Sequence, residues 1–145
     1  MRIAVSACLL GEPCRYDGRA KPCAAVQGLA SRGHELVPVC PEVAGGLPTP
    51  RTPCEIVRAP WMGADEQRDS RIASAGRDEN ATKAERVDRS WKIVDANGID
   101  RTAAYERGAR IELSRAREAG CKLAILKAKS PSCGVREVYD GTFSG

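Results

Sequence analysis

The sequence is poor in aromatic side chains, which make up 4% of its 145 residues, and it contains one histidine, His34. With so few rings, the core must consist mainly of Val, Ile, Leu and Ala. A single histidine argues against metal sites built from several imidazoles and against Cys-His nucleophilic catalysis. Surfaces that stack nucleic-acid bases need aromatic residues beside basic ones, so binding to long nucleic acid is weakly supported.

Long apolar runs are also missing. No stretch approaches the roughly 20 residues that a membrane-spanning helix needs, so we expect no interaction with membranes. Residues 1–5 run directly into a strand-like sequence without the pattern of a secretory signal, which predicts a cytoplasmic protein. The length predicts a single domain over residues 1–145. The net charge of +4 favours anionic ligands mildly, although a solvated surface explains it as well.

The seven cysteines lack the close pairing that disulfide frameworks and zinc fingers show. Their number is odd, and no two of them stand at C-x-x-C spacing. Three of them, Cys8, Cys40 and Cys133, follow short apolar runs that are typical of buried parallel strands. Because the carboxyl ends of such strands meet at one edge of a sheet, we expect these thiols to converge. Each thiol alone is explained by burial as a small apolar side chain, but three equivalent positions favour a metal, cluster or thiol-based site.

The order of the elements predicts a Rossmann-like α/β fold, in which helices flank a parallel sheet and the cysteines lie on loops at the C-terminal ends of strands. We predict strands at 2–6, 35–39, 55–58 and 122–127, and helices at 21–31 and 102–119. The second helix is expected to bury the face that carries Tyr105, Ala109, Leu113 and Ala116. Residues 59–92 are polar and charged, which predicts a surface excursion.

Several polar residues near the strand-end cysteines are candidates for chemistry. Glu42, two residues after Cys40, is a candidate general acid or base, or alternatively a carboxylate at a helix start. Ser130 and Ser132 flank Pro131, and either hydroxyl could orient a substrate or pass a proton; a Ser-Pro turn is the alternative. A small anion-binding rim, which solvated loops explain equally well, would consist of Arg15, Arg51, Lys127 and Lys129. Among the other thiols, Cys14 is the best candidate for an additional ligand, because it shares the loop of Cys8.

Four blocks of sequence together resemble the DUF523 family of thiouracil desulfurases. The first is Val-Ser-Ala-Cys-Leu-Leu-Gly at 5–11, followed by Arg-Tyr-Asp-Gly at 15–18. The second is Pro-Val-Cys-Pro-Glu at 38–42, followed by Gly-Leu-Pro-Thr-Pro-Arg at 46–51. The third is Ala-Ile-Leu-Lys at 124–127 with Ser-Pro-Ser-Cys-Gly at 130–134, and the fourth is Tyr-Asp-Gly-Thr-Phe at 139–143.

The resemblance implies an iron–sulfur enzyme. It implies a [4Fe-4S] cluster held by Cys8, Cys40 and Cys133, whose open iron takes the sulfur of a thiolated pyrimidine. Water would then replace the sulfur without net redox chemistry, turning thiouracil into uracil and releasing sulfide. The family's acid–base carboxylate would be Glu42 and its serine would be Ser130. The partner implied is a small thiolated nucleobase or nucleotide.

Two departures from the family pattern stand out. The family usually continues after the last block into a further strand and helix, whereas this chain ends at Gly145, so we expect that element to be absent. Cys14 stands where relatives can carry a residue without a thiol, and the resemblance therefore gives it no ligand role.

Two other functions are compatible with the thiols. A non-catalytic carrier would bind zinc or a persulfide for delivery, and clustered thiols without histidine favour it. A thiol redox sensor would use the remaining cysteines. Turnover of thiouracil would distinguish the enzyme from both, because neither alternative produces uracil.

Overall fold

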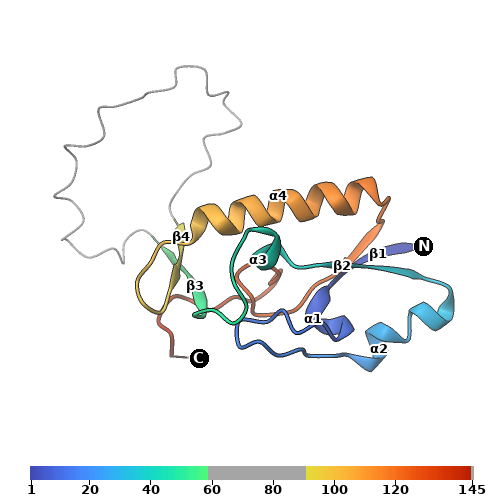
Figure 1. Ribbon diagram of the computed structural model, residues 1–145, viewed down its shortest axis with the longest axis horizontal. Coiled ribbons are helices and arrows are strands. Elements are labelled where there is room, and N and C mark those ends of the chain that lie inside the picture. The colour runs from blue at the N-terminus through green and yellow to red at the C-terminus, as the bar shows by residue number, and fades with distance from the viewer. Residues whose placement is uncertain (59–90, 145) are drawn as a thin grey trace, which may run out of the picture.

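The computed structural model describes residues 1–58 and 91–144, and a three-stranded parallel sheet lies at its centre (Figure 1). The strands are β1 (Arg2–Ser6), β2 (Glu35–Val39) and β5 (Leu123–Ile125), in the order β2-β1-β5. Arg2 pairs with Glu35 on one side of β1, and Ile3 pairs with Leu123 on the other. The predicted α/β fold with a parallel sheet and flanking helices is confirmed, although β5 is shorter than the predicted strand.

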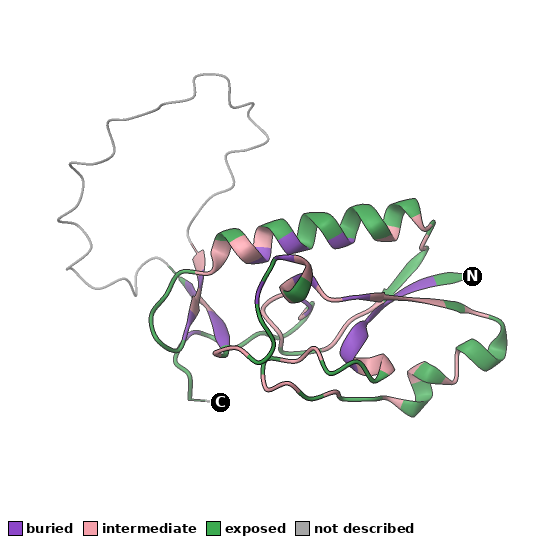
Figure 2. Ribbon diagram, viewed as in Figure 1, coloured by how far each residue is buried: buried purple, intermediate pink, exposed green. Residues whose placement is uncertain are grey.

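Strand β1 is the most deeply buried part of the sheet. Ile3, Ala4 and Val5 are buried, and Val5 has no exposed surface (Figure 2). A continuous apolar run is expected here, because both neighbouring strands and both faces of a central parallel strand are covered. Figure 1 shows the long helix α4 (Thr102–Glu118) along one side of the sheet, with the short helices α1 (Ala7–Leu10) and α2 (Ala24–Gln27) on the opposite side. No helix in 1–58 or 91–144 has the length and apolar character needed to cross a membrane.

The helix predicted at 21–31 is much shorter in the structure. Only α2 is α-helical, Gly28 ends it, and a separate 3-10 turn covers Ala30–Arg32. Neither piece buries a residue. Short helices are marginal unless they pack an apolar face, so a segment with no buried side chain does not extend into a regular helix.

A two-stranded hairpin lies beside the start of α4 (Figure 1). Its strands β3 (Cys54–Arg58) and β4 (Trp91–Asp95) pair antiparallel, with Cys54 opposite Asp95. Strand β4 was not predicted, and its first two residues had been assigned to the excursion at 59–92. The remainder of that predicted excursion, residues 59–90, lies outside the described residues.

Helix α4 packs against the short helix α3 (Pro41–Ala44) through a face that differs from the predicted one. The buried residues of α4 are Tyr105, Gly108 and Glu112, whereas Leu113 is 51% exposed. The predicted face is therefore wrong at Ala109 and Leu113, which are exposed, whereas Tyr105 is buried as predicted and Ala116 is half-buried. The inward positions are a glycine and a carboxylate, which hydrophobic periodicity cannot identify.

Gly108 lets the two helices approach to backbone distance. A Cβ atom built at Gly108 would overlap the carbonyl group of Pro41 and the amide nitrogen of Gly45. We expect Gly108→Ala to lower the free energy of unfolding by about 1–3 kcal/mol, since neither backbone group is free to yield. Helix propensity alone predicts the opposite sign, a gain of about 1 kcal/mol. Urea unfolding measures the difference.

The exposed neighbour Ala109 offers a matched control for this prediction. Ala109→Gly reports the cost of glycine in this helix without a change in packing, expected to be about 1 kcal/mol. A Gly108→Ala protein that is as stable as the wild type, or more stable, would contradict close backbone packing between α3 and α4.

Candidate active site

The carboxyl ends of β1, β2 and β5 lie at the same edge of the sheet, and each leads to one of the three predicted cysteines. Cys8 follows β1 but lies in the helical turn α1 rather than in a loop. Cys40 follows β2 directly and precedes α3. Cys133 lies farther along, in a turn after β5 that a hydrogen bond from the Gly134 amide to the Ser130 carbonyl closes at 2.7 Å. Cys8 and Cys133 are buried, and Cys40 is half-buried.

Neighbouring thiols lie close enough to Cys8 and Cys133 to raise the pKa of each. Burial raises the pKa of the Cys8 thiol, and the Cys133 and Cys40 thiols raise it further, whereas Lys127 and Arg15 act in the opposite direction. Burial also raises the pKa of Cys133. These charge interactions indicate that Cys8, Cys40 and Cys133 lie near one another, and their role as ligands of one cluster stays a prediction.

Cys14 is a fourth thiol in the same place. Burial, the charge of Cys40 and a side-chain hydrogen bond with Cys40 raise the pKa of Cys14 to about 12. The more distant Cys8 contributes in the same direction. Within residues 1–58 and 91–144, however, no three His, Cys, Asp or Glu side chains have the spacing of ligands to a single metal ion.

Glu42, in the first turn of α3, uses its two carboxylate oxygens differently. Its Oε1 atom accepts hydrogen bonds from Ser132 Oγ at 2.9 Å and from Ser130 Oγ at 3.2 Å. Its Oε2 atom accepts from Arg51, at 2.7 Å from Nε and 2.5 Å from Nη2. The carboxylate is therefore held by a cation on one side and by two hydroxyl groups on the other.

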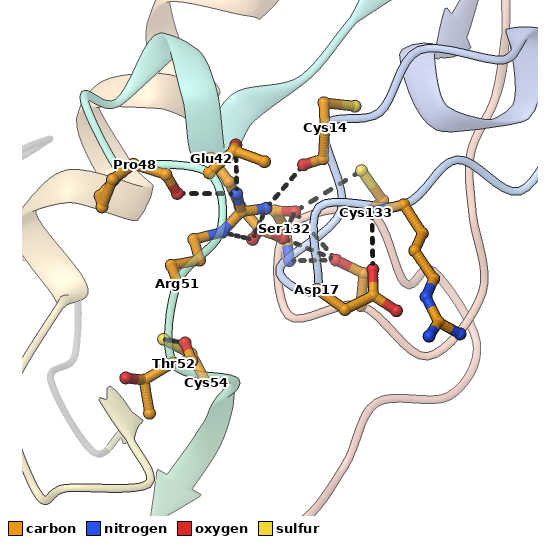
Figure 3. Close-up of polar contacts among 12 residues, drawn as sticks. Cys14, Asp17, Glu42, Pro48, Arg51, Thr52, Cys54, Ser132 and Cys133 are labelled. Atoms are coloured by element: carbon orange, nitrogen blue, oxygen red, sulfur yellow. Dashed lines mark hydrogen bonds and ion pairs between the residues drawn. The ribbon is translucent and has the colours of Figure 1, made fainter.

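Both serines of the Ser-Pro-Ser-Cys block reach this carboxylate. The Ser130 and Ser132 hydroxyl oxygens lie 3.0 Å apart. Ser132 Oγ also lies 3.6 Å from Cys133 Sγ (Figure 3). The resemblance pointed to Ser130, whereas the shorter bond to Glu42 and the contact with a thiol belong to Ser132. The residue types alone had left both open.

Two of the four cations of the expected anion-binding rim, Arg15 and Arg51, are engaged in ion pairs, whereas Lys129 is exposed. Arg51 is enclosed in the ion pair with Glu42, and its side chain is only 6% exposed. Arg15 forms an ion pair with Asp17 at 3.1 Å, while its Nε atom is buried without a hydrogen-bond partner in the described part of the chain. Lys127 donates from Nζ to the neighbouring carbonyl of Ala128 at 3.1 Å.

Helix α4 supports the site with Glu112, which the sequence analysis did not identify, and with Tyr105, which it predicted to be buried. Glu112 is buried, accepts the backbone N–H of Cys40 at 3.2 Å and binds Arg115 Nη1 through both of its oxygens at 2.9 Å. Tyr105 lies beside Cys54, and its pKa is raised by burial and by the nearby charge of Glu42. A buried Glu one turn from a buried Gly is no recognisable motif, so only the packing reveals the role of Glu112.

The comparisons with known proteins agree with this geometry. Residues 3–145 match the family model described as 2-thiouracil desulfurase. The chain belongs to the 2-thiouracil desulfurase family. The family that the four sequence blocks resemble is thereby confirmed.

Two relatives of this desulfurase-family chain are similar over nearly its full length. The uncharacterized protein YbbK of Bacillus subtilis (strain 168) is 36% identical over 143 residues, which cover 99% of this chain and 80% of YbbK. The solved structure of the [4Fe-4S]-dependent thiouracil desulfidase TudS is also 36% identical and has a TM-score of 0.69. That match covers 99% of this chain and 75% of TudS.

Proposed function

We propose that this protein removes the sulfur atom from a thiolated pyrimidine, using a [4Fe-4S] cluster bound by Cys8, Cys40 and Cys133. Family membership and the similarity to TudS support the reaction class and the cofactor. The observation that carries the proposal is the convergence of the three thiols beside Glu42 and its two serines.

The donor set fits an iron–sulfur cluster. Thiolate sulfur is the usual ligand of such clusters, and these three thiols have no histidine close to them. A cluster distributes its ligands over several irons, so its thiolates stand farther apart than the ligands of a single ion. This agrees with the spacing of the described side chains, which suits no single metal ion. The buried, unpartnered N–H of Arg15 also suits a neighbouring sulfide, since hydrogen bonds to cluster sulfur are common.

When bound by three thiolates, the cluster would supply one iron as a Lewis acid toward the substrate's sulfur. The side chains around it would manage water and protons. Glu42 would accept a proton from the attacking water through Oε1, because its Oε2 atom is occupied by Arg51. Ser130 and Ser132 would orient the substrate or the water along that same oxygen.

The reaction balances without an external oxidant or reductant. The C–S bond of the thiocarbonyl group breaks, a C–O bond to water forms, and both protons of the water leave with sulfur as hydrogen sulfide. The products are the oxo-pyrimidine and one sulfide per substrate. The substrate is accordingly a small thiolated nucleobase or nucleotide.

Anaerobic reconstitution with iron and sulfide tests this function directly. We expect about four irons per chain, a broad visible absorption band, and conversion of 2- or 4-thiouracil into equal amounts of uracil and sulfide. Folded protein that takes up no iron would contradict the cluster. A chain that assembles the cluster but forms no uracil would keep the cluster site and point to a thiolated substrate other than thiouracil.

A further inference from the structure

Arg51 is the most highly connected side chain of the site. Its Nε and Nη2 atoms bind Glu42 Oε2, and Nη2 also donates to the carbonyl of Cys14 at 2.9 Å. Its Nη1 atom donates to the Pro48 carbonyl and to Thr49 Oγ1, both at 3.1 Å. Figure 3 shows the guanidinium group between Glu42, Pro48 and Cys14. All three of its nitrogen atoms are thus in use.

This arrangement fixes the rotation of the Glu42 carboxylate. A guanidinium group is planar and rigid. Two of its nitrogens bind one oxygen of Glu42, and its other hydrogen bonds hold the group in place. The carboxylate therefore has little freedom to turn. Glu42 is itself 13% exposed. Its Oε1 atom is therefore kept toward Ser132 and Ser130, and its Oε2 atom is kept away from them.

The same side chain joins segments that carry different thiols. The Cys14 carbonyl belongs to the loop that follows Cys8, while Glu42 follows Cys40. The backbone supports this junction, because the Arg51 amide donates to the Tyr16 carbonyl at 2.8 Å. Since Arg51 bonds to neither serine, its influence on them passes through the Glu42 carboxylate.

We propose that Arg51 is a positioning residue for desulfuration: it locks Glu42 so that Oε1 alone exchanges a proton, with Ser132 as the nearest hydroxyl partner. This inference rests on the proposed function and adds to it a role for Arg51 and separate roles for the two carboxylate oxygens of Glu42. A lysine at this position could supply the positive charge but not the planar pair of N–H donors, so Arg51→Lys separates the effect of charge from the effect of geometry.

The activity test compares Arg51→Ala and Arg51→Lys with Arg110→Ala, an exposed arginine on α4. At matched iron content, we expect kcat to fall about 100-fold in Arg51→Ala and about tenfold in Arg51→Lys, with KM nearly unchanged. The solvent deuterium isotope effect on kcat should rise in both. Millimolar guanidinium should restore part of the activity of Arg51→Ala and leave Arg110→Ala unaffected. Unchanged kcat and isotope effect in Arg51→Ala would overturn the proposal.

A second measurement does not depend on turnover. In the full chain, the Arg51 Nε–H should give a slowly exchanging ¹⁵N–¹H signal that is lost in Glu42→Ala. If the Arg51 Nε–H exchanged with solvent as fast as that of Arg110, the paired hydrogen bonds between Arg51 and Glu42 would not form in solution, and the proposal would fail. If the signal is present but wild-type protein takes up no iron and forms no uracil, the proposed function itself is contradicted, and the positioning role of Arg51 with it.

Discussion

Replacement of Cys8, Cys40 or Cys133 by serine is expected to abolish cluster binding and, with it, all desulfuration. Serine has nearly the same size as cysteine, so packing around the buried positions changes little. Its hydroxyl group does not ionise near neutral pH, and iron–sulfur clusters are held by thiolates. The iron content per chain after anaerobic reconstitution measures the effect, with the visible absorption as a second readout.

Cys23→Ser and Cys121→Ser serve as controls for these variants. Both thiols are half-buried, one at the start of α2 and one just before β5, and neither is among the groups that shift the pKa of Cys8 or Cys133. They should retain about four irons per chain. Full iron content in any one of the Cys8, Cys40 or Cys133 variants would remove that residue from the ligand set.

Cys14→Ser decides between two versions of the site. The charge of Cys40 contributes to the raised pKa of Cys14, so the position of Cys14 is compatible with a ligand. If three thiolates suffice, this variant should keep its iron and its activity. Loss of iron would show that a fourth thiolate is required, and the open coordination position on the proposed cluster would then be wrong.

Glu42→Gln is expected to lower kcat by about 10²- to 10⁴-fold while the iron content stays that of the wild type. Glutamine keeps the size of the side chain and one oxygen, but it cannot take up a proton, and general acid–base groups typically contribute within that range. Steady-state turnover of thiouracil at matched iron content measures the loss. A kcat within threefold of the wild type would contradict the acid–base role.

The substitution also leaves Arg51 buried without its counter-ion, so stability must be followed in parallel. Removing one partner of a buried ion pair typically costs about 3–5 kcal/mol. Glu35→Gln is the matched control, because Glu35 pairs with Arg2 at 2.7 Å on the exposed surface. Such exposed pairs contribute about 0–1 kcal/mol. Urea unfolding of both variants separates a loss of folding from a loss of catalysis.

The parts of the fold that follow from apolar runs could be predicted from the sequence. Strand β1 is a buried run and β2 is a partly buried one, both with clear ends, and their parallel pairing places Cys8 and Cys40 at one edge. The candidate acid–base residue at that edge could also be predicted from the sequence, because Glu42 lies two residues after Cys40. Local pattern and chain order were sufficient for these features.

The supports of the site could not be predicted, because they depend on contacts distant in the sequence. In the sequence, Arg51 is indistinguishable from a solvated cation on a loop, and only the fold places the Glu42 carboxylate beside it. The buried face of α4 contains Gly108, which allows close approach to α3, and Glu112, which accepts a hydrogen bond from the Cys40 amide. A hydrophobic pattern cannot indicate either role.

The strand order β2-β1-β5 has a consequence for how the protein matures. The thiols come from early, middle and late parts of the chain, and only non-local parallel pairings bring them together. Such pairings raise the contact order and form late, after the loops between them have closed. The nascent chain emerging from the ribosome therefore holds no preformed cluster site, and we expect iron and sulfide to be delivered to the folded protein after synthesis.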